Sequence, residues 1–161
     1  MVFLGVDPGL SGAIAALDAE GSLIALADLP VIRDLSLAWI DGGKLHSLLS
    51  EAIAGRSCRA TVERVSSMPG QGVASSFQFG VGFGSILSVL QVLEIPVELV
   101  TPGVWKRSCG LGKDKRAALD KARLLFPSAE LSLAKHHGRA EALLLADFGR
   151  RVNLGLHTSA R

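Results

Sequence analysis

The chain has 161 residues, of which 48% are apolar, and its formal net charge is +2. This length is typical of a single domain that folds without disulfides, and the apolar content excludes wholesale disorder. Two cysteines, Cys58 and Cys109, are too few for a disulfide framework or a cysteine-based zinc site. Because the apolar N-terminus reaches Asp7 without a basic lead, we expect no signal peptide and a cytoplasmic protein.

The charged residues are unevenly divided along the chain. Residues 1–100 hold 5 Lys or Arg and 10 Asp or Glu, a net charge of −5. Residues 101–161 hold 12 Lys or Arg and 5 Asp or Glu, a net charge of +7. A basic half favours a polyanionic partner, although a chance distribution of surface charge explains the same asymmetry.

The first part of the chain is predicted to begin with three consecutive antiparallel strands. The apolar runs over 2–6, 13–18 and 22–29 are separated by short segments with turn-forming residues. Apolar residues at three- and four-residue spacing predict a helix over 41–54. Residues 58–63 are predicted to form a fourth strand, which ends in a carboxylate.

No charged residue occurs between Val65 and Leu93. This stretch is long enough to cross a membrane, but turn residues over 66–72 and interspersed serines and glutamines argue against that interpretation. We expect a loop followed by a helix over 74–93 that is buried on most faces. Its glycines permit close approach of another backbone, so we hypothesise a homodimer interface; a central core helix would have the same composition.

The second part is predicted to contain a strand over 96–100 and three helices. The first is short, with Thr101 as N-cap and Pro102 at its first position. The others span 114–126 and 138–152. This order predicts an α/β fold with a mixed sheet and helices on both faces. We expect one domain over residues 1–152 and a flexible tail over 153–161.

Carboxylates end two of the predicted strands. Asp7 and Glu63 converge if the first and fourth strands are neighbours, and buried like charges repel unless a cation lies between them. The last helix adds His137 and Glu141 on one face. These four residues are candidate ligands for two Mg²⁺ or Mn²⁺ ions serving in-line hydrolysis of a phosphodiester. Taken singly, these residues also fit purely structural roles. Asp7 fits a turn, Glu63 fits a solvated strand end, and His137 fits an exposed surface position.

Three segments together resemble the RuvC-type Holliday junction resolvases of the RNase H-like superfamily. They are Gly5-Val6-Asp7-Pro8-Gly9-Leu10-Ser11-Gly12, Val62-Glu63, and Gly138-Arg139-Ala140-Glu141-Ala142-Leu143-Leu144-Leu145-Ala146. Further stretches look closer to the phage-type and plant plastid branch: His136 to Leu144, Met68-Pro69-Gly70-Gln71-Gly72, and Trp105-Lys106-Arg107 with Lys113-Asp114-Lys115. The resemblance spans nearly the whole chain. It implies an RNase H-like five-stranded mixed sheet and a homodimeric, metal-dependent endonuclease that cuts opposed strands of a four-way DNA junction symmetrically.

The resemblance also implies roles for individual residues. Asp7, Glu63 and Glu141 match the catalytic acids, and His137 matches the histidine that some members use in place of a fourth acid. His137 is then a metal ligand or a general acid for the departing 3′ oxygen. Lys113 matches the active-site lysine of the plastid resolvases. Standard RuvC has two aspartates three residues apart, whereas Gly138 stands three residues before Glu141.

Contacts to the DNA backbone are expected from basic residues, which give affinity without sequence readout. The candidates are Lys106, Arg107, Lys115, Arg116 and Arg139. For most of these residues, the alternative interpretation is a helix face that is simply exposed to solvent. Met68 or Phe77 is expected to wedge into unstacked bases at the junction centre. Trp39 and Trp105 are interpreted as structural.

Alternative functions keep the fold but change the substrate. The same chemistry on forks, flaps or RNA–DNA hybrids is the main alternative, and a monomer would favour it. An actin-like ATPase would need a second, similar domain, and a non-catalytic module would be expected to lack one of the acids. The cleavage sequence and the source, whether phage, bacterium or organelle, stay open. The compartment is then the cytoplasm with its nucleoid, or an organelle matrix.

Overall fold

A five-stranded mixed sheet forms the centre of the protein. The computed structural model describes all residues except 35–36, 67–69, 71, 113 and 157–161. The strands lie in the order β3-β2-β1-β6-β7, with bounds β1 (Val2–Asp7), β2 (Ala13–Leu17), β3 (Leu23–Asp28), β6 (Cys58–Glu63) and β7 (Val97–Val100). Strands β1, β2 and β3 are antiparallel, whereas β6 and β7 run parallel to β1. The predicted mixed sheet is confirmed.

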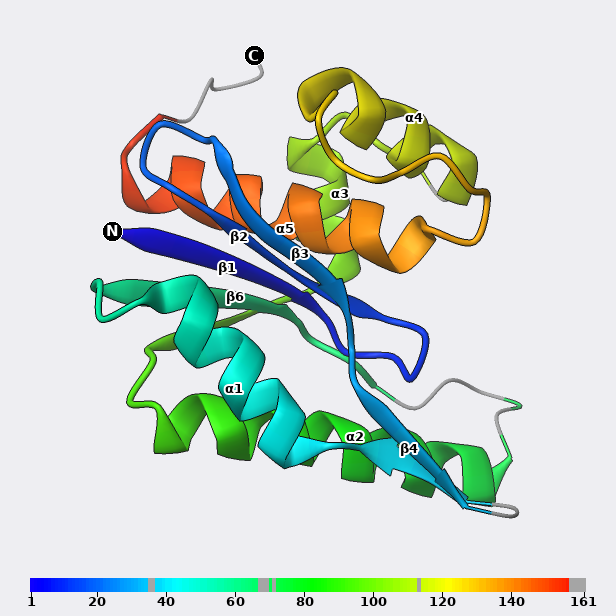
Figure 1. The fold of residues 1–161 in the computed structure, drawn as a ribbon. Coiled ribbons are helices and arrows are strands. Elements are labelled where there is room, and N and C mark those ends of the chain that lie inside the picture. The colour runs from blue at the N-terminus through cyan, green and yellow to red at the C-terminus, as the bar shows by residue number, and fades with distance from the viewer. Residues whose placement is uncertain (35–36, 67–69, 71, 113, 157–161) are drawn as a thin grey trace.

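Helices cover both faces of this sheet (Figure 1). One face carries α1 (Gly42–Ile53) and α2 (Val73–Val92). The other carries α3 (Pro102–Ser108), α4 (Lys115–Leu125) and α5 (His137–Asn153). The helices agree with the predicted ones to within about two residues. Pro102 occupies the start of α3 as predicted, but the Thr101 side chain makes no capping hydrogen bond.

The sheet separates two hydrophobic cores. Alternate residues of β1, Val2, Leu4 and Val6, belong to the core under α1 and α2. Residues of β2 such as Ala13 and Leu17 belong to the core under α3, α4 and α5. Successive side chains of a strand point to opposite faces, so both faces of the central strands are buried. Polar side chains from these strands therefore emerge at their ends.

Helix α5 lies directly on β1 and β6. A Cβ atom at Gly5 would overlap the backbone of Ala142 and Ala146, and one at Gly149 would overlap the Thr61 side chain. Glycine is required at both places because any side chain would push the helix off the sheet. This close packing fixes the height of α5 over β1, and with it the position of Glu141.

A two-stranded antiparallel hairpin, β4 (Val31–Asp34) and β5 (Leu37–Ile40), was not predicted. Each strand has four residues, too few for a clear alternating pattern. The hairpin lies beside α2 (Figure 1), and the side-chain amide of Gln78 donates to the Ala38 carbonyl at 2.9 Å.

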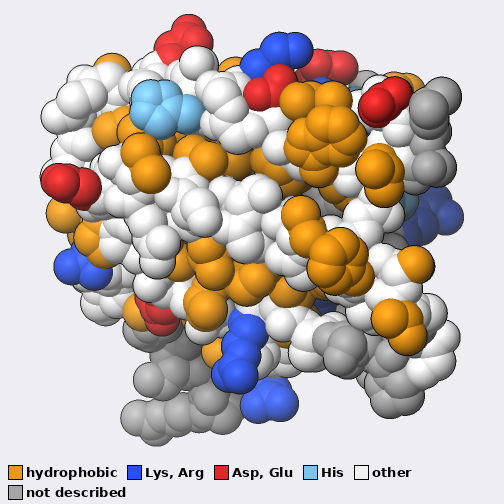
Figure 2. Space-filling view, turned by 90° about the horizontal axis from the view of Figure 1, so that it is seen from below, with side chains coloured by type: hydrophobic (Ala, Val, Ile, Leu, Met, Phe, Trp, Pro, Cys, Tyr) orange, Lys and Arg blue, Asp and Glu red, His pale blue; other side chains and the backbone are white. Residues whose placement is uncertain are grey.

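Helix α2 is buried along one stripe only. Ile86 and Leu90 are buried, whereas Val73, Phe77 and Val81 are exposed. The expectation that α2 is buried on most faces is therefore wrong for a single chain. Within the described residues, α2 is the one helix long and apolar enough to cross a membrane by length and composition, which is weak evidence for a span. Figure 2 views the molecule from the side of the sheet that α2 covers, where hydrophobic side chains spread across the middle.

Candidate active site

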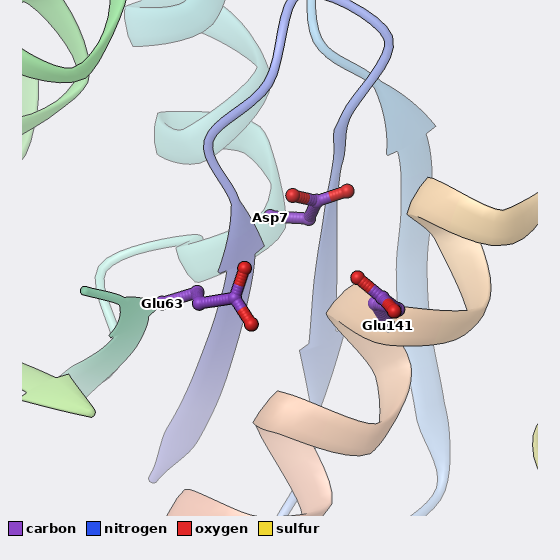
Figure 3. A group of neighbouring side chains, drawn as sticks. All are labelled: Asp7, Glu63 and Glu141. Atoms are coloured by element: carbon purple, nitrogen blue, oxygen red, sulfur yellow. The ribbon is translucent and has the colours of Figure 1, made fainter. Parts of the chain in front are cut away.

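Three carboxylates meet at one edge of the sheet. Asp7 is the last residue of β1, Glu63 is the last residue of β6, and Glu141 lies in the first part of α5. One carboxylate oxygen from each lies within 4.8 Å of the others. Figure 3 shows the three groups pointing toward one another. The predicted convergence of Asp7 and Glu63 follows from the parallel pairing of β1 with β6.

Two glycines shape the backbone around Asp7. The amide of Gly12 donates to the Gly9 carbonyl at 2.8 Å, which closes the turn after β1. A Cβ atom at Gly138 would lie 2.6 Å from the Ser11 carbonyl oxygen and 3.2 Å from Oδ2 of Asp7. An aspartate at position 138 would therefore displace the Asp7 turn.

The carboxylate cluster carries more negative charge than its surroundings neutralise. Burial, followed by the charges of Glu141 and Glu63, raises the pKa of Asp7 from 3.8 to about 7. Burial is also the main cause that raises the pKa of Glu63, and the hydrogen bond from Trp105 opposes it. A bound cation would relieve this repulsion. Three carboxylates are an oxygen donor set suited to Mg²⁺ or Mn²⁺, so the residues fit such an ion.

Two neighbouring residues of α3 extend the cluster. Nζ of Lys106 lies 2.8 Å from Oε1 of Glu141, and the ammonium lies 5.1 Å from the centre of the Trp105 ring. The indole nitrogen of Trp105 donates to Glu63 at 2.9 Å. The sequence analysis assigned Lys106 to DNA phosphates and interpreted Trp105 as structural. Trp105 is indeed fully buried, but both contacts to the acids were missed. One signal was available in the sequence. Helix α3 directly follows β7, and β7 pairs with β6, so α3 begins close to Glu63 at the end of β6.

His137 is not part of the carboxylate group. It is the first residue of α5, and it lines a pocket together with Arg116 and Arg123 of α4. The four-residue spacing from Glu141 therefore does not bring the imidazole into the described cluster of three acids. Its role as a metal ligand or general acid stays a prediction.

The other candidate residues are distributed over the surface. Phe77, Arg107 and Arg116 are exposed. The guanidinium of Arg139 instead donates to both carboxylate oxygens of Asp28, at 2.7 and 3.0 Å, and to Glu130 at 3.3 Å. Met68, Lys113 and the side chain of Lys115 lie outside the part of the structure that is described.

Comparison with sequences of known proteins gives one partial relative. No protein-family model matches the chain. A Holliday junction resolvase MOC1, chloroplastic, of Chlamydomonas reinhardtii is 36% identical over 100 residues, covering 58% of this chain and 11% of that protein. The chain thus spans about a tenth of the length of this relative.

Comparison with solved structures defines the fold. Thermus thermophilus RuvC in complex with a Holliday junction substrate matches with a TM-score of 0.67 and 17% identity, over 96% of this chain and 97% of that one. A second Thermus thermophilus RuvC structure matches with a TM-score of 0.59 and 19% identity, over 96% and 97% of the two chains. The fold is that of RuvC, an RNase H-like α/β fold.

Proposed function

We propose that this protein is a metal-dependent endonuclease that cuts four-way DNA junctions by paired symmetric nicks. The observation that carries the proposal is the cluster of Asp7, Glu63 and Glu141 at the edge of a RuvC-like sheet. The partial relative named as a Holliday junction resolvase and the RuvC structure holding junction DNA support this substrate.

Each residue of the cluster has a role in this proposal. Asp7, Glu63 and Glu141 hold one or two Mg²⁺ or Mn²⁺ ions, which supply activation of water and stabilisation of the departing oxygen when bound. Trp105 orients Glu63 through its indole hydrogen bond. Lys106 orients Glu141 through their ion pair. Its positive charge also reduces the repulsion between a DNA phosphate and the three acids. In the metal-free chain the pKa of Asp7 is raised to about 7, and a bound cation would hold this carboxylate ionised.

The paired nicks require two active sites, and we propose that α2 provides the interface between two copies. Val73, Phe77 and Val81 are exposed at four-residue spacing along this uncharged helix. A Cβ at Gly80 or Gly84 would meet no atom within 4 Å, so a second backbone can approach closely. An exposed apolar helix face of this kind marks an interaction site. The chain runs from Glu63 into α2. A dimer that forms through α2 therefore holds two catalytic clusters.

Basic residues of the second half supply the DNA contacts in this proposal. Arg107 and Arg116 are exposed and available to phosphates, and Lys115 is a further candidate, whereas the guanidinium of Arg139 is engaged by Asp28 and Glu130. Met68 wedges into unstacked bases in this proposal, because Phe77 belongs to the α2 interface, and Lys113 joins the active site. We place the protein in a compartment that holds DNA, either the cytoplasm with its nucleoid or an organelle matrix, as for the chloroplastic relative.

The test is cleavage of a labelled immobile four-way junction beside linear duplex, a splayed fork and an RNA–DNA hybrid. Each substrate is incubated with Mg²⁺, with Mn²⁺ and with a chelator. Junction cleavage that the chelator abolishes supports the proposal. Preferred cleavage of the fork or the hybrid would keep the fold and metal chemistry but assign the alternative substrate class.

A further inference from the structure

The β4–β5 hairpin exposes an apolar face to solvent. Ile32 and Trp39 are paired directly across the two strands, and Leu37 lies two residues before Trp39, so these three side chains share one face. We call this the outer face. All three residues are exposed, Leu37 by 64% and Trp39 by 37%. Large apolar side chains gathered on the surface of one chain mark an interaction site.

The opposite face of the hairpin holds it in place. Ile40 is buried in the core under α1 and α2, and Val31, its partner across the strands, packs against the same core. The side-chain amide of Gln78 on α2 donates to the Ala38 carbonyl at 2.9 Å. The hairpin is therefore fixed along α2 with its outer face turned away from the core.

The outer face adjoins the exposed stripe of α2, which consists of Val73, Phe77 and Val81. Phe77 immediately precedes Gln78, the residue that binds the hairpin, and Val81 follows one turn later. In Figure 2 hydrophobic side chains extend over α2 and over the hairpin beside it. The outer face and the exposed stripe thus form one apolar surface.

The exposed stripe alone is small for a stable dimer. A buried aromatic side chain covers about 150–250 Å², so one phenylalanine and two valines supply no more than about half of the roughly 800 Å² per partner that a stable interface needs. The three apolar side chains of the outer face bring the surface nearer to that size. A contact on a second element also resists rotation of one copy about α2.

The charge of the outer face favours a second copy over DNA as its partner. Among its described residues the charged one is Asp34, opposite Leu37 next to the hairpin tip, whereas Arg33 lies on the opposite face because strand residues alternate. DNA phosphates would require basic side chains there. In a two-fold dimer the same patch is buried on both copies, so an apolar surface with a polar rim fits.

This inference rests on the dimer of the proposed function and adds a second element to its interface. We propose that the outer face of the hairpin, built from Ile32, Leu37 and Trp39, is buried against the second copy beside the exposed stripe of α2.

Tryptophan fluorescence tests this contact without any assay of cleavage. The chain has two tryptophans, and Trp105 is fully buried, so quenching by acrylamide follows Trp39. Wild-type protein is compared with the double variant Phe77→Glu/Val81→Glu, which the proposed α2 interface predicts to be a monomer. Trp39→Phe is the control for the signal. Sedimentation velocity measures the oligomeric state of each sample at the same concentrations.

We expect acrylamide to quench Trp39 at least about threefold less in the wild-type dimer than in the monomeric double variant, because an interface excludes water from such anchors. A wild-type dimer whose Trp39 is as accessible as in the monomer would overturn this inference alone. A monomeric wild type, or a double variant that stays dimeric, would overturn the proposed α2 interface and this inference with it. Protection of Trp39 by junction DNA in the monomeric variant would assign the outer face to DNA instead.

Leu37→Glu tests the same contact through the strength of the dimer. Leu37 is mostly exposed, so a single chain tolerates the charge, whereas burying it in a dimer is costly. We expect the dimer dissociation constant to rise at least about thirtyfold, with the control Leu124→Glu on α4 unchanged. An unchanged dissociation constant in Leu37→Glu would contradict the hairpin contact and leave the α2 interface standing.

Discussion

Lys106 and Glu141 form an ion pair of 2.8 Å that joins α3 to α5 across 35 positions of the sequence. The pair is largely shielded from solvent, with side-chain exposures of 23% and 12%, so it is screened less than a surface pair. Its location beside Asp7 and Glu63 means that the lysine offsets part of the repulsion among three acids.

Replacing this lysine should affect catalysis more than DNA binding. Lys106→Gln removes the charge beside Glu141 but leaves the basic surface of α4 intact. We expect single-turnover junction cleavage to fall by one to two orders of magnitude, with less than about a threefold loss of junction affinity. The contrasting variant is Arg107→Gln on the exposed side of α3, which should lose junction affinity rather than cleavage rate. Equal losses of rate and affinity for Lys106→Gln would make it a phosphate contact only.

Asp7→Asn should separate binding from cleavage. The substitution keeps the shape of the side chain but removes the charge that the metal requires. We expect cleavage to fall by at least two orders of magnitude while junction affinity stays within a few-fold of wild type. Parallel gel-shift and cleavage assays measure both quantities. Loss of junction binding together with cleavage would count against a purely catalytic role for Asp7.

Metal-free protein should lose stability as the pH rises. The pKa of Asp7 is raised to about 7 in the folded chain, whereas the unfolded chain keeps the ordinary value of 3.8. The folded state therefore binds the extra proton between about pH 4 and pH 7, and this contribution disappears above that range. In chelator we expect a thermal midpoint several degrees lower at pH 8 than at pH 5, with a smaller difference in Asp7→Asn.

A divalent ion should reverse that pH dependence. Mg²⁺ or Mn²⁺ competes with protons for the same carboxylates, so added metal should raise the thermal midpoint more at pH 8 than at pH 5. Equal stabilisation by metal in wild type and Asp7→Asn would contradict the assignment of the ion to this cluster.

Arg139 should contribute to stability more than to DNA binding. Its bidentate hydrogen bonds hold the pKa of the Asp28 carboxyl below its ordinary value. This stabilisation is present at neutral pH and is lost as the pH falls through the lowered pKa of Asp28. Arg139→Gln should therefore destabilise the fold by about 1 kcal/mol at pH 7, less at acid pH, with Arg33→Gln as control. A drop in junction affinity without destabilisation would restore the DNA-binding role.

Charges placed on the exposed stripe of α2 should produce a folded monomer. Phe77 is 72% exposed and Val81 is 44% exposed, so glutamates at both positions are tolerated by a single chain. The control is Leu124→Glu on α4, where the side chain is 81% exposed. Sedimentation velocity should show a dimer for wild type and control and a monomer for the double variant. A monomeric wild type would contradict the interface, and partition of the wild type into lipid vesicles would point to a membrane surface instead.

The fold and the three acids could be predicted because their signals are local. Apolar runs ending at Asp7 and Glu63 predicted strands that end in carboxylates, which converge if the two strands are neighbours; the pairing of β1 with β6 meets that condition. The helical periods of 41–54 and 114–126 predicted α1 and α4 to within a residue or two. Glycines at 5 and 149 show why α5 is held so near the sheet.

Contacts between distant segments could not be predicted in the same way. The pair Lys106–Glu141 and the hydrogen bond from Trp105 to Glu63 depend on how α3 docks against α5 and β6, which no local pattern encodes. The spacing of His137 from Glu141 was local, but it does not bring the imidazole into the described cluster of three acids. The hairpin of β4 and β5 was missed because its strands are short.

The most direct test of the central claim uses a supercoiled plasmid that extrudes a cruciform from an inverted repeat. A dimer that cuts both opposed strands in one binding event converts this plasmid to linear DNA without accumulating nicked circles. We predict linear product with Mg²⁺ or Mn²⁺, none with chelator and none with Asp7→Asn. Accumulation of nicked circles alone, or equal cutting of a plasmid that lacks the repeat, would contradict paired cleavage of a four-way junction.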